Sequence, residues 1–85
     1  MRSFSTKPTF DKQLKKLDQS TSGMVLKRME KIMGRPELGK PLNAPMQNYF
    51  SERIGKYRVI YRFTADHVTF VYLDHRDHVF SRPFE

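Results

Sequence analysis

The chain contains no cysteine among its 85 residues. Disulfide bonds and thiolate metal sites are therefore excluded. It also has no apolar run long enough to cross a membrane, and its first residues lack the apolar centre of a signal peptide. We therefore expect a cytoplasmic protein that has no membrane partner.

Acidic residues are scarce, because nine Asp and Glu stand against sixteen Lys and Arg, for a net charge of +7. Such a balance favours a partner of opposite charge: nucleic acid, an acidic protein or a membrane surface. Most of the excess charge lies before residue 49, whereas the later cations are nearly all arginines, whose planar fork suits phosphate. With 38% hydrophobic residues, residues 1–85 are expected to form a single domain with one core.

The first half of the chain predicts a strand followed by two helices. Polar and apolar residues alternate weakly over residues 2–6, which predicts a short strand. Pro8 or Thr9 is expected to open a first helix. The Ser- and Thr-rich residues 19–23 predict a turn that caps a second helix over residues 23–33. Both helices carry an apolar stripe at helical spacing: Phe10, Leu14 and Leu17, then Val25, Met29, Ile32 and Met33.

The second half predicts strands. A loop with three prolines covers residues 36–45, and strand-like segments follow at residues 49–54, 56–64 and 67–73. The order β-α-α-β-β-β indicates an α+β fold. We expect two N-terminal helices packed on one face of a small antiparallel sheet of about four strands.

The tight turn at Gly55 and Lys56 sets the register of the strands and places Arg53 opposite Arg58. Like charges in directly opposed positions are unfavourable without a counter-anion, so this pair indicates a bound phosphate or an acidic partner. The alternative is that the arginines lie along the sheet and pair with its own carboxylates (Glu52, Asp74 or Asp77). Alternation predicts a core face of Tyr57, Val59, Tyr61, Phe63, Val68, Phe70 and Tyr72, and an outer face of Arg53, Arg58, Ile60, Arg62, Thr69, Val71 and Leu73. The outer face is expected to expose an apolar strip among its arginines, which favours a protein or nucleotide partner.

Residues 74–80 bring histidine and arginine together near the C-terminus. Histidine is the usual general acid or base near neutral pH, and arginine can stabilise a developing phosphorane. Two histidines beside two aspartates also suggest a metal site, but the sequence does not indicate three or four convergent ligands. We expect no metal and no cofactor.

Residues 53–61 and 75–80 closely resemble the RelE/ParE toxin superfamily. They match an R-x-G-x-YR-x-x-Y strand pair and approximate a terminal HR-x-x-x-Y pattern. RelE-like members enter the ribosomal A site, cleave mRNA by attack of the 2′-OH, and are silenced by an antitoxin. The resemblance implies that Arg58 stabilises the scissile phosphate, that Arg76 stabilises or protonates the leaving oxygen, and that Arg53 supports them.

The chain departs from the RelE pattern at the expected base. Tyr49 and Ser51 stand where RelE has lysines, so the proton shuttle is expected to be His75 or His78. Glu52 is a weaker candidate, because its position in the strand points to the core side of the sheet. The terminal aromatic is a phenylalanine, Phe80, which can stack on a nucleotide but cannot donate a hydrogen bond. Arg62 and Lys56 are expected to add contacts to RNA phosphate.

The sequence therefore predicts a ribosome-dependent mRNA endoribonuclease of a type II toxin–antitoxin system. Its expected partners are the ribosome, mRNA and a cognate antitoxin in a toxin–antitoxin hetero-oligomer. Two alternatives are a ParE-like non-catalytic gyrase poison, which shares the fold, and a non-toxic basic module that binds RNA or the ribosome.

Overall fold

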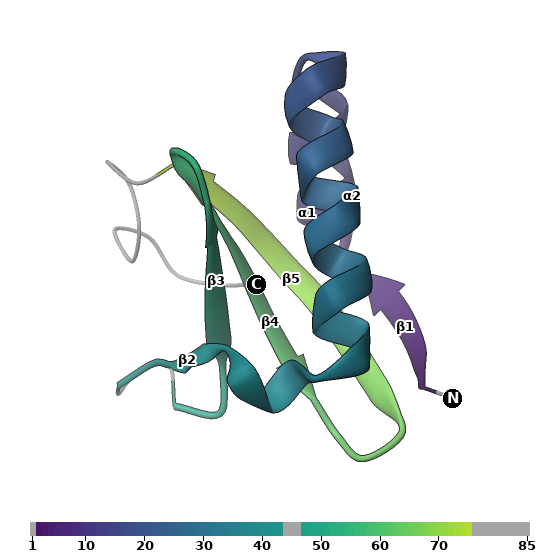
Figure 1. The fold of residues 1–85 in the computed structure, drawn as a ribbon, viewed down its shortest axis with the longest axis vertical. Coiled ribbons are helices and arrows are strands. Elements are labelled where there is room, and N and C mark those ends of the chain that lie inside the picture. The colour runs from purple at the N-terminus through teal and green to yellow at the C-terminus, as the bar shows by residue number, and fades with distance from the viewer. Residues whose placement is uncertain (1, 44–46, 76–85) are drawn as a thin grey trace.

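Two helices cover one face of a five-stranded sheet in the computed structural model, which describes residues 2–43 and 47–75 (Figure 1). This arrangement confirms the predicted α+β class and the order of the main elements. A short 3-10 helix and a two-residue strand were not predicted. The elements are β1 (Ser3–Thr6), α1 (Pro8–Lys15), α2 (Gln19–Gly34), η1 (Pro36–Leu38), β2 (Lys40–Pro41), β3 (Phe50–Ile54), β4 (Tyr57–Phe63) and β5 (His67–His75).

The sheet is mixed and has the strand order β1-β5-β4-β3-β2. Strand β1 pairs with β5 in parallel, with Ser3 opposite His67, while the other pairs are antiparallel. The predicted antiparallel pairing is confirmed for β2 to β5, while the parallel edge formed by β1 and the two-residue strand β2 were not expected. The parallel direction was not predicted because the partner of β1 is distant in sequence, and a local pattern does not encode the direction of such a pairing.

Helix α2 begins at Gln19, four residues earlier than predicted. The Asp18 carboxylate caps it by accepting hydrogen bonds from the Thr21 hydroxyl (2.6 Å) and the Thr21 backbone N–H (3.2 Å). These two bonds favour the ionised carboxylate and lower the pKa of Asp18 from its ordinary value. The Ser- and Thr-rich segment predicted as a turn is therefore the first turn of the helix.

The main core lies between the helices and the sheet. Helix α1 ends at Lys15, so Leu17 lies in the link between the helices, but it still packs against the core as predicted. Phe10 is fully buried and packs its ring near that of Phe70. The buried members of this core cluster are Phe10, Val25, Met29, Ile32, Ile54, Val59, Tyr61, Val68, Phe70 and Leu73.

The predicted register of β3 and β4 is confirmed. Arg53 lies opposite Arg58, and Ile54 lies opposite Tyr57. Gly55 opens the intervening turn with a φ of 59°, a conformation that glycine adopts at little cost.

The β4–β5 pairing contains a bulge. Its register shifts between Ile60 and Tyr61, which leaves Val71 as an extra residue on β5. Beyond the bulge every side chain changes face. Tyr72 therefore joins Ile60 on the outer face and Leu73 joins the core, so the predicted faces of these two residues are wrong.

Tyr61 ties the sheet to the segment that follows α2. Its ring is fully buried, and its hydroxyl donates a hydrogen bond of 2.6 Å to the Pro36 carbonyl. A Cβ atom at position 39 would overlap that hydroxyl, so Gly39 is what allows the close approach. Burial raises the pKa of Tyr61 to about 12.

Candidate functional site: an arginine face on the sheet

Three arginines lie on the face of the sheet that is turned away from the helices. Strand residues alternate, so β4 directs Val59 into the core and Arg58 and Arg62 to the opposite side. Arg53 of β3 joins them because it lies directly opposite Arg58. We call this set, Arg53, Arg58 and Arg62, the arginine face.

Two cations oppose one another at the Arg53–Arg58 pair. Arg53 is exposed and Arg58 is half-buried. The Arg58 Nε atom is buried and has no hydrogen-bond partner within the part of the chain that the structure describes. A buried donor without an acceptor is costly, and two opposed cations add repulsion. An anion with several acceptor oxygens would relieve both costs.

Arg62 is associated with an aromatic ring on the same face. Its Nη1 donates to the Tyr49 hydroxyl at 3.3 Å, and its guanidinium carbon lies 6.0 Å from the centre of the Tyr49 ring. We did not predict a role for Tyr49 on this face. Its spacing by even numbers from Ser51 and Arg53 was the signal that could have indicated it.

The apolar strip predicted among the arginines is buried. Ile60 and Val71 are each only 1% exposed. They form a second, smaller cluster with Tyr72, against which Leu42 and Tyr49 pack. The arginines therefore lie beside a packed apolar cluster, and the prediction of an exposed apolar surface there is wrong.

Glu52 belongs to the other side of the sheet, as its position in the strand predicted. Its carboxylate accepts a hydrogen bond of 2.9 Å from Arg28 of α2, and its side chain is only 10% exposed. The alternative in which Glu52 neutralises the arginine face is therefore wrong. Asp74 lies opposite Arg58 on β5, and Asp77 lies outside the described residues.

The other predicted site residues are placed as follows. Lys56 is exposed in the β3–β4 turn, at the end of the hairpin that carries Arg53 and Arg58. His75 lies opposite Tyr57, and the two rings meet edge to face with centres 5.4 Å apart. This places His75 on the side of Tyr57 and not of Arg58. Arg76, His78 and Phe80 lie outside the described residues.

The described residues offer no set of metal ligands, because no three His, Asp or Glu side chains gather in one place among residues 2–43 and 47–75. Within the same residues, no helix is both long and apolar enough to cross a membrane.

Comparison with known proteins places the chain among toxins. The family described as "ParE toxin of type II toxin-antitoxin system, parDE" matches residues 5–80. Toxin RelG of Mycobacterium tuberculosis is 43% identical over 47 residues, which cover 53% of this chain and 54% of RelG. The chain thus spans about half the length of this curated relative.

Two solved structures share the fold. The toxin–antitoxin complex RelBE2 of Mycobacterium tuberculosis matches with a TM-score of 0.80 and 28% identity, covering 88% of this chain and 91% of that one. The intact E. coli RelBE toxin–antitoxin complex matches with a TM-score of 0.74 and 15% identity, covering 88% of this chain and 96% of that one. Because the family match spans most of the chain, the protein belongs to the ParE toxin family of type II toxin–antitoxin systems, within the RelE/ParE superfamily.

Proposed function

We propose that this toxin is an endoribonuclease that cleaves mRNA in the ribosomal A site and so inhibits translation. The observation that carries the proposal is the Arg53–Arg58 pair, with two opposed cations and a buried Arg58 Nε that has no acceptor among the described residues. The scissile phosphate is the anion that would complete it.

The proposed reaction is an intramolecular transesterification. The ribose 2′-OH attacks the adjacent phosphorus and loses its proton to a base. The bond to the 5′ oxygen breaks, and that oxygen receives a proton. Arg58 stabilises the charge that develops on the phosphate oxygens, and Arg53 supports it. The cleaved chain supplies its own nucleophile, so positioning and electrostatics carry the reaction without a metal.

The remaining roles stay predictions from the sequence. Arg76 stabilises or protonates the leaving oxygen, and Phe80 stacks on a nucleotide. Of the two candidate bases we now favour His78, because His75 lies against Tyr57 on the other side of the strand. Arg62 and Lys56 bind flanking phosphates.

We propose that a cognate antitoxin holds the protein in a hetero-oligomer until it is released. RelBE2 and E. coli RelBE are both toxin–antitoxin complexes, which supports this partner. The proposed target is the translating ribosome, so the protein acts in the cytoplasm.

A translation extract programmed with a defined mRNA tests the proposed reaction. Primer extension after addition of the purified protein is expected to reveal cuts only in translated message. Arg58→Ala is expected to reduce cleavage by about 100-fold or more, as for loss of other transition-state donors. Arg35→Ala is the matched control, because Arg35 is an exposed arginine at the end of α2. Equal cleavage by both variants would contradict the assignment of Arg58.

The second candidate is a gyrase poison that does not cleave RNA, which the match to the ParE family favours. It predicts that translated mRNA stays intact and that gyrase loses supercoiling activity in the presence of the protein. A supercoiling assay run beside the cleavage assay distinguishes the two functions.

A further inference from the structure

Arg62 lies at a distance from the other two arginines of the arginine face. Arg53 and Arg58 lie near the β3–β4 turn, whereas Arg62 stands four residues farther along β4. At about 3.3 Å per residue, Arg58 and Arg62 are roughly 13 Å apart along the strand. Between them Ser51 pairs with Ile60, and these two residues are only 3% and 1% exposed. One nucleotide does not span that distance, so a ligand of Arg62 occupies a separate site.

Arg62 forms this separate site together with Tyr49. The Tyr49 hydroxyl accepts the hydrogen bond from Arg62, and the guanidinium lies 6.0 Å from the centre of the Tyr49 ring. A planar ring beside a guanidinium suits an unpaired nucleotide, because the base can stack on the ring and the cation can pair with the phosphate. Thr69 of β5 lies opposite Arg62, and Ser5 of β1 lies opposite Thr69. These hydroxyl-bearing residues continue the row across the sheet, and hydroxyl groups are common donors to phosphate and sugar oxygens.

The fold holds Tyr49 in place. Its carbonyl accepts a hydrogen bond of 3.0 Å from the Leu42 N–H, and its side chain packs against the smaller apolar cluster of the outer face. The preceding residue, Asn48, has a φ of 78°, a left-handed conformation that asparagine adopts more readily than most residues. Tyr49 is only half-buried, and Arg62 is exposed. A ring that is fixed and still accessible loses little freedom when a base stacks on it, which favours binding.

We propose that Tyr49 and Arg62 bind one unpaired nucleotide of the RNA, whose base stacks on the Tyr49 ring and whose phosphate pairs with Arg62. The inference rests on the proposed function in taking RNA as the ligand. It adds a nucleobase site that holds a neighbour of the nucleotide whose phosphate Arg58 binds. Stacking accepts every base, and its strength differs among bases, so the site aligns the RNA and biases where it is cut. Tyr49 is therefore a positioning residue that does not contact the reacting atoms.

Direct binding tests the nucleobase site without any need for cleavage. The probe is a short fluorescent single-stranded RNA, and its affinity for the purified full chain is measured by anisotropy at a fixed salt concentration. Tyr49→Leu keeps an apolar side chain against the cluster but removes the aromatic plane, and it is expected to weaken binding by about tenfold. Tyr49→Phe keeps the ring and is expected to retain most of the affinity.

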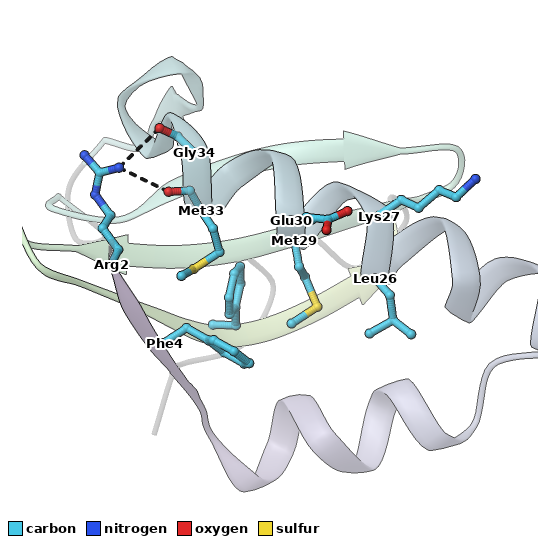
Figure 2. Close-up of a pocket in the computed structure, with 9 residues that line it drawn as sticks. Arg2, Phe4, Leu26, Lys27, Met29, Glu30, Met33 and Gly34 are labelled. Carbon is cyan, nitrogen blue, oxygen red and sulfur yellow. Dashed lines mark hydrogen bonds between the residues drawn. The ribbon is translucent and has the colours of Figure 1, made fainter.

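Two controls separate stacking from other effects of the substitution. Phe4→Ala removes a ring that is 55% exposed from the opposite side of the sheet, where Phe4 lines a groove with Leu26 and Met33 of α2 (Figure 2). Its affinity for the RNA is expected to equal that of the wild type. The second control is a probe of the same length that carries sugars and phosphates but no bases. Tyr49→Leu is expected to bind this abasic probe as well as the wild type does, because no base is present to stack.

Each result supports or overturns the nucleobase site. Equal weakening of both probes by Tyr49→Leu would make Tyr49 a structural residue and overturn the proposal, and so would a Tyr49→Phe variant as weak as Tyr49→Leu. A wild type that binds neither probe, or both equally, would refute the site. In the translation extract, Tyr49→Leu is expected to change the positions of the cuts, and Tyr49→Phe is expected to keep them. Base-dependent binding through Tyr49 by a wild type that leaves translated mRNA intact would support the nucleobase site and refute the nuclease.

Discussion

The buried hydroxyl of Tyr61 makes a prediction whose magnitude follows from the structure. Tyr61→Phe keeps the ring in the core and removes the hydrogen bond to the Pro36 carbonyl. That carbonyl also accepts from the Gly39 N–H at 3.3 Å, so it is not left entirely without a donor. We therefore expect a loss of about 1–1.5 kcal/mol in the free energy of unfolding, below the full cost of an orphaned group. For a domain of this size, that corresponds to a fall of about 5–10 °C in melting temperature.

Urea denaturation followed by circular dichroism measures this loss, and an unchanged m-value would show that the unfolded state is unaffected. Tyr61→Ala is the larger perturbation and is expected to lower the free energy of unfolding by about 3–5 kcal/mol, because it also leaves a cavity in the core. A Tyr61→Phe protein within about 0.5 kcal/mol of the wild type, the range typical of surface positions, would refute the reasoning.

Gly39 supplies an independent check of the same contact. Gly39→Ala places a Cβ against the Tyr61 hydroxyl and is expected to destabilise the wild type. The same substitution is expected to cost less in the Tyr61→Phe background, because the obstructing oxygen is gone. A double-mutant cycle measures this coupling, and additive effects would show that the two residues do not meet.

The pH dependence of stability follows from the raised pKa of Tyr61. Folding favours the neutral phenol, whose pKa is about 12 in the folded protein and 10.0 ordinarily. The contribution is complete below pH 10 and is lost as the pH rises towards 12. Tyr61→Phe is expected to lack this component when the two proteins are compared between pH 9 and 12.

Two further predictions concern a carboxylate with no proposed catalytic role and a helix cap. Glu52→Gln is expected to keep full mRNA cleavage and to lower stability, because Arg28 of α2 loses its ion-pair partner. A lower cleavage rate without a loss of stability would instead place Glu52 in the reaction. Asp18→Ala is expected to lower the melting temperature at pH 7, whereas Asp18→Asn retains most of the cap. Because the pKa of Asp18 is lowered in the folded protein, the ionised cap stabilises the fold at pH values above the ordinary pKa of 3.8, and this stabilisation is lost as the pH falls below that value. Thermal melts of Asp18→Asn are expected to lack this loss of stability in acid.

Local chemistry was sufficient to predict most of the fold. The turn at Gly55 and Lys56 placed Arg53 opposite Arg58, and the apolar stripes identified the buried side of each helix. The prediction was wrong at the start of α2, where the capping residue lies outside the Ser- and Thr-rich segment. Asp18 competes with the serines and threonines after it for the cap of α2, and composition alone does not say which residue caps.

The outer face was harder to predict than the core. One extra residue at Val71 exchanges the faces of Tyr72 and Leu73, and no residue type marks a bulge of this kind. Tyr49 was overlooked because it stands where the resemblance led us to expect a lysine. Its contact with Arg62 depends on strand pairing, which only the assembled sheet defines.

The parallel pairing of β1 with β5 affects how the protein folds while it is being synthesised. Ser3 to Thr6 pair with His67 to Phe70, so the first strand has no partner until nearly the whole chain has been synthesised. Contacts this distant in sequence slow folding, because a long loop must close before they form. The β1 edge of the sheet therefore forms only after β5 has been synthesised, so the fold is completed late.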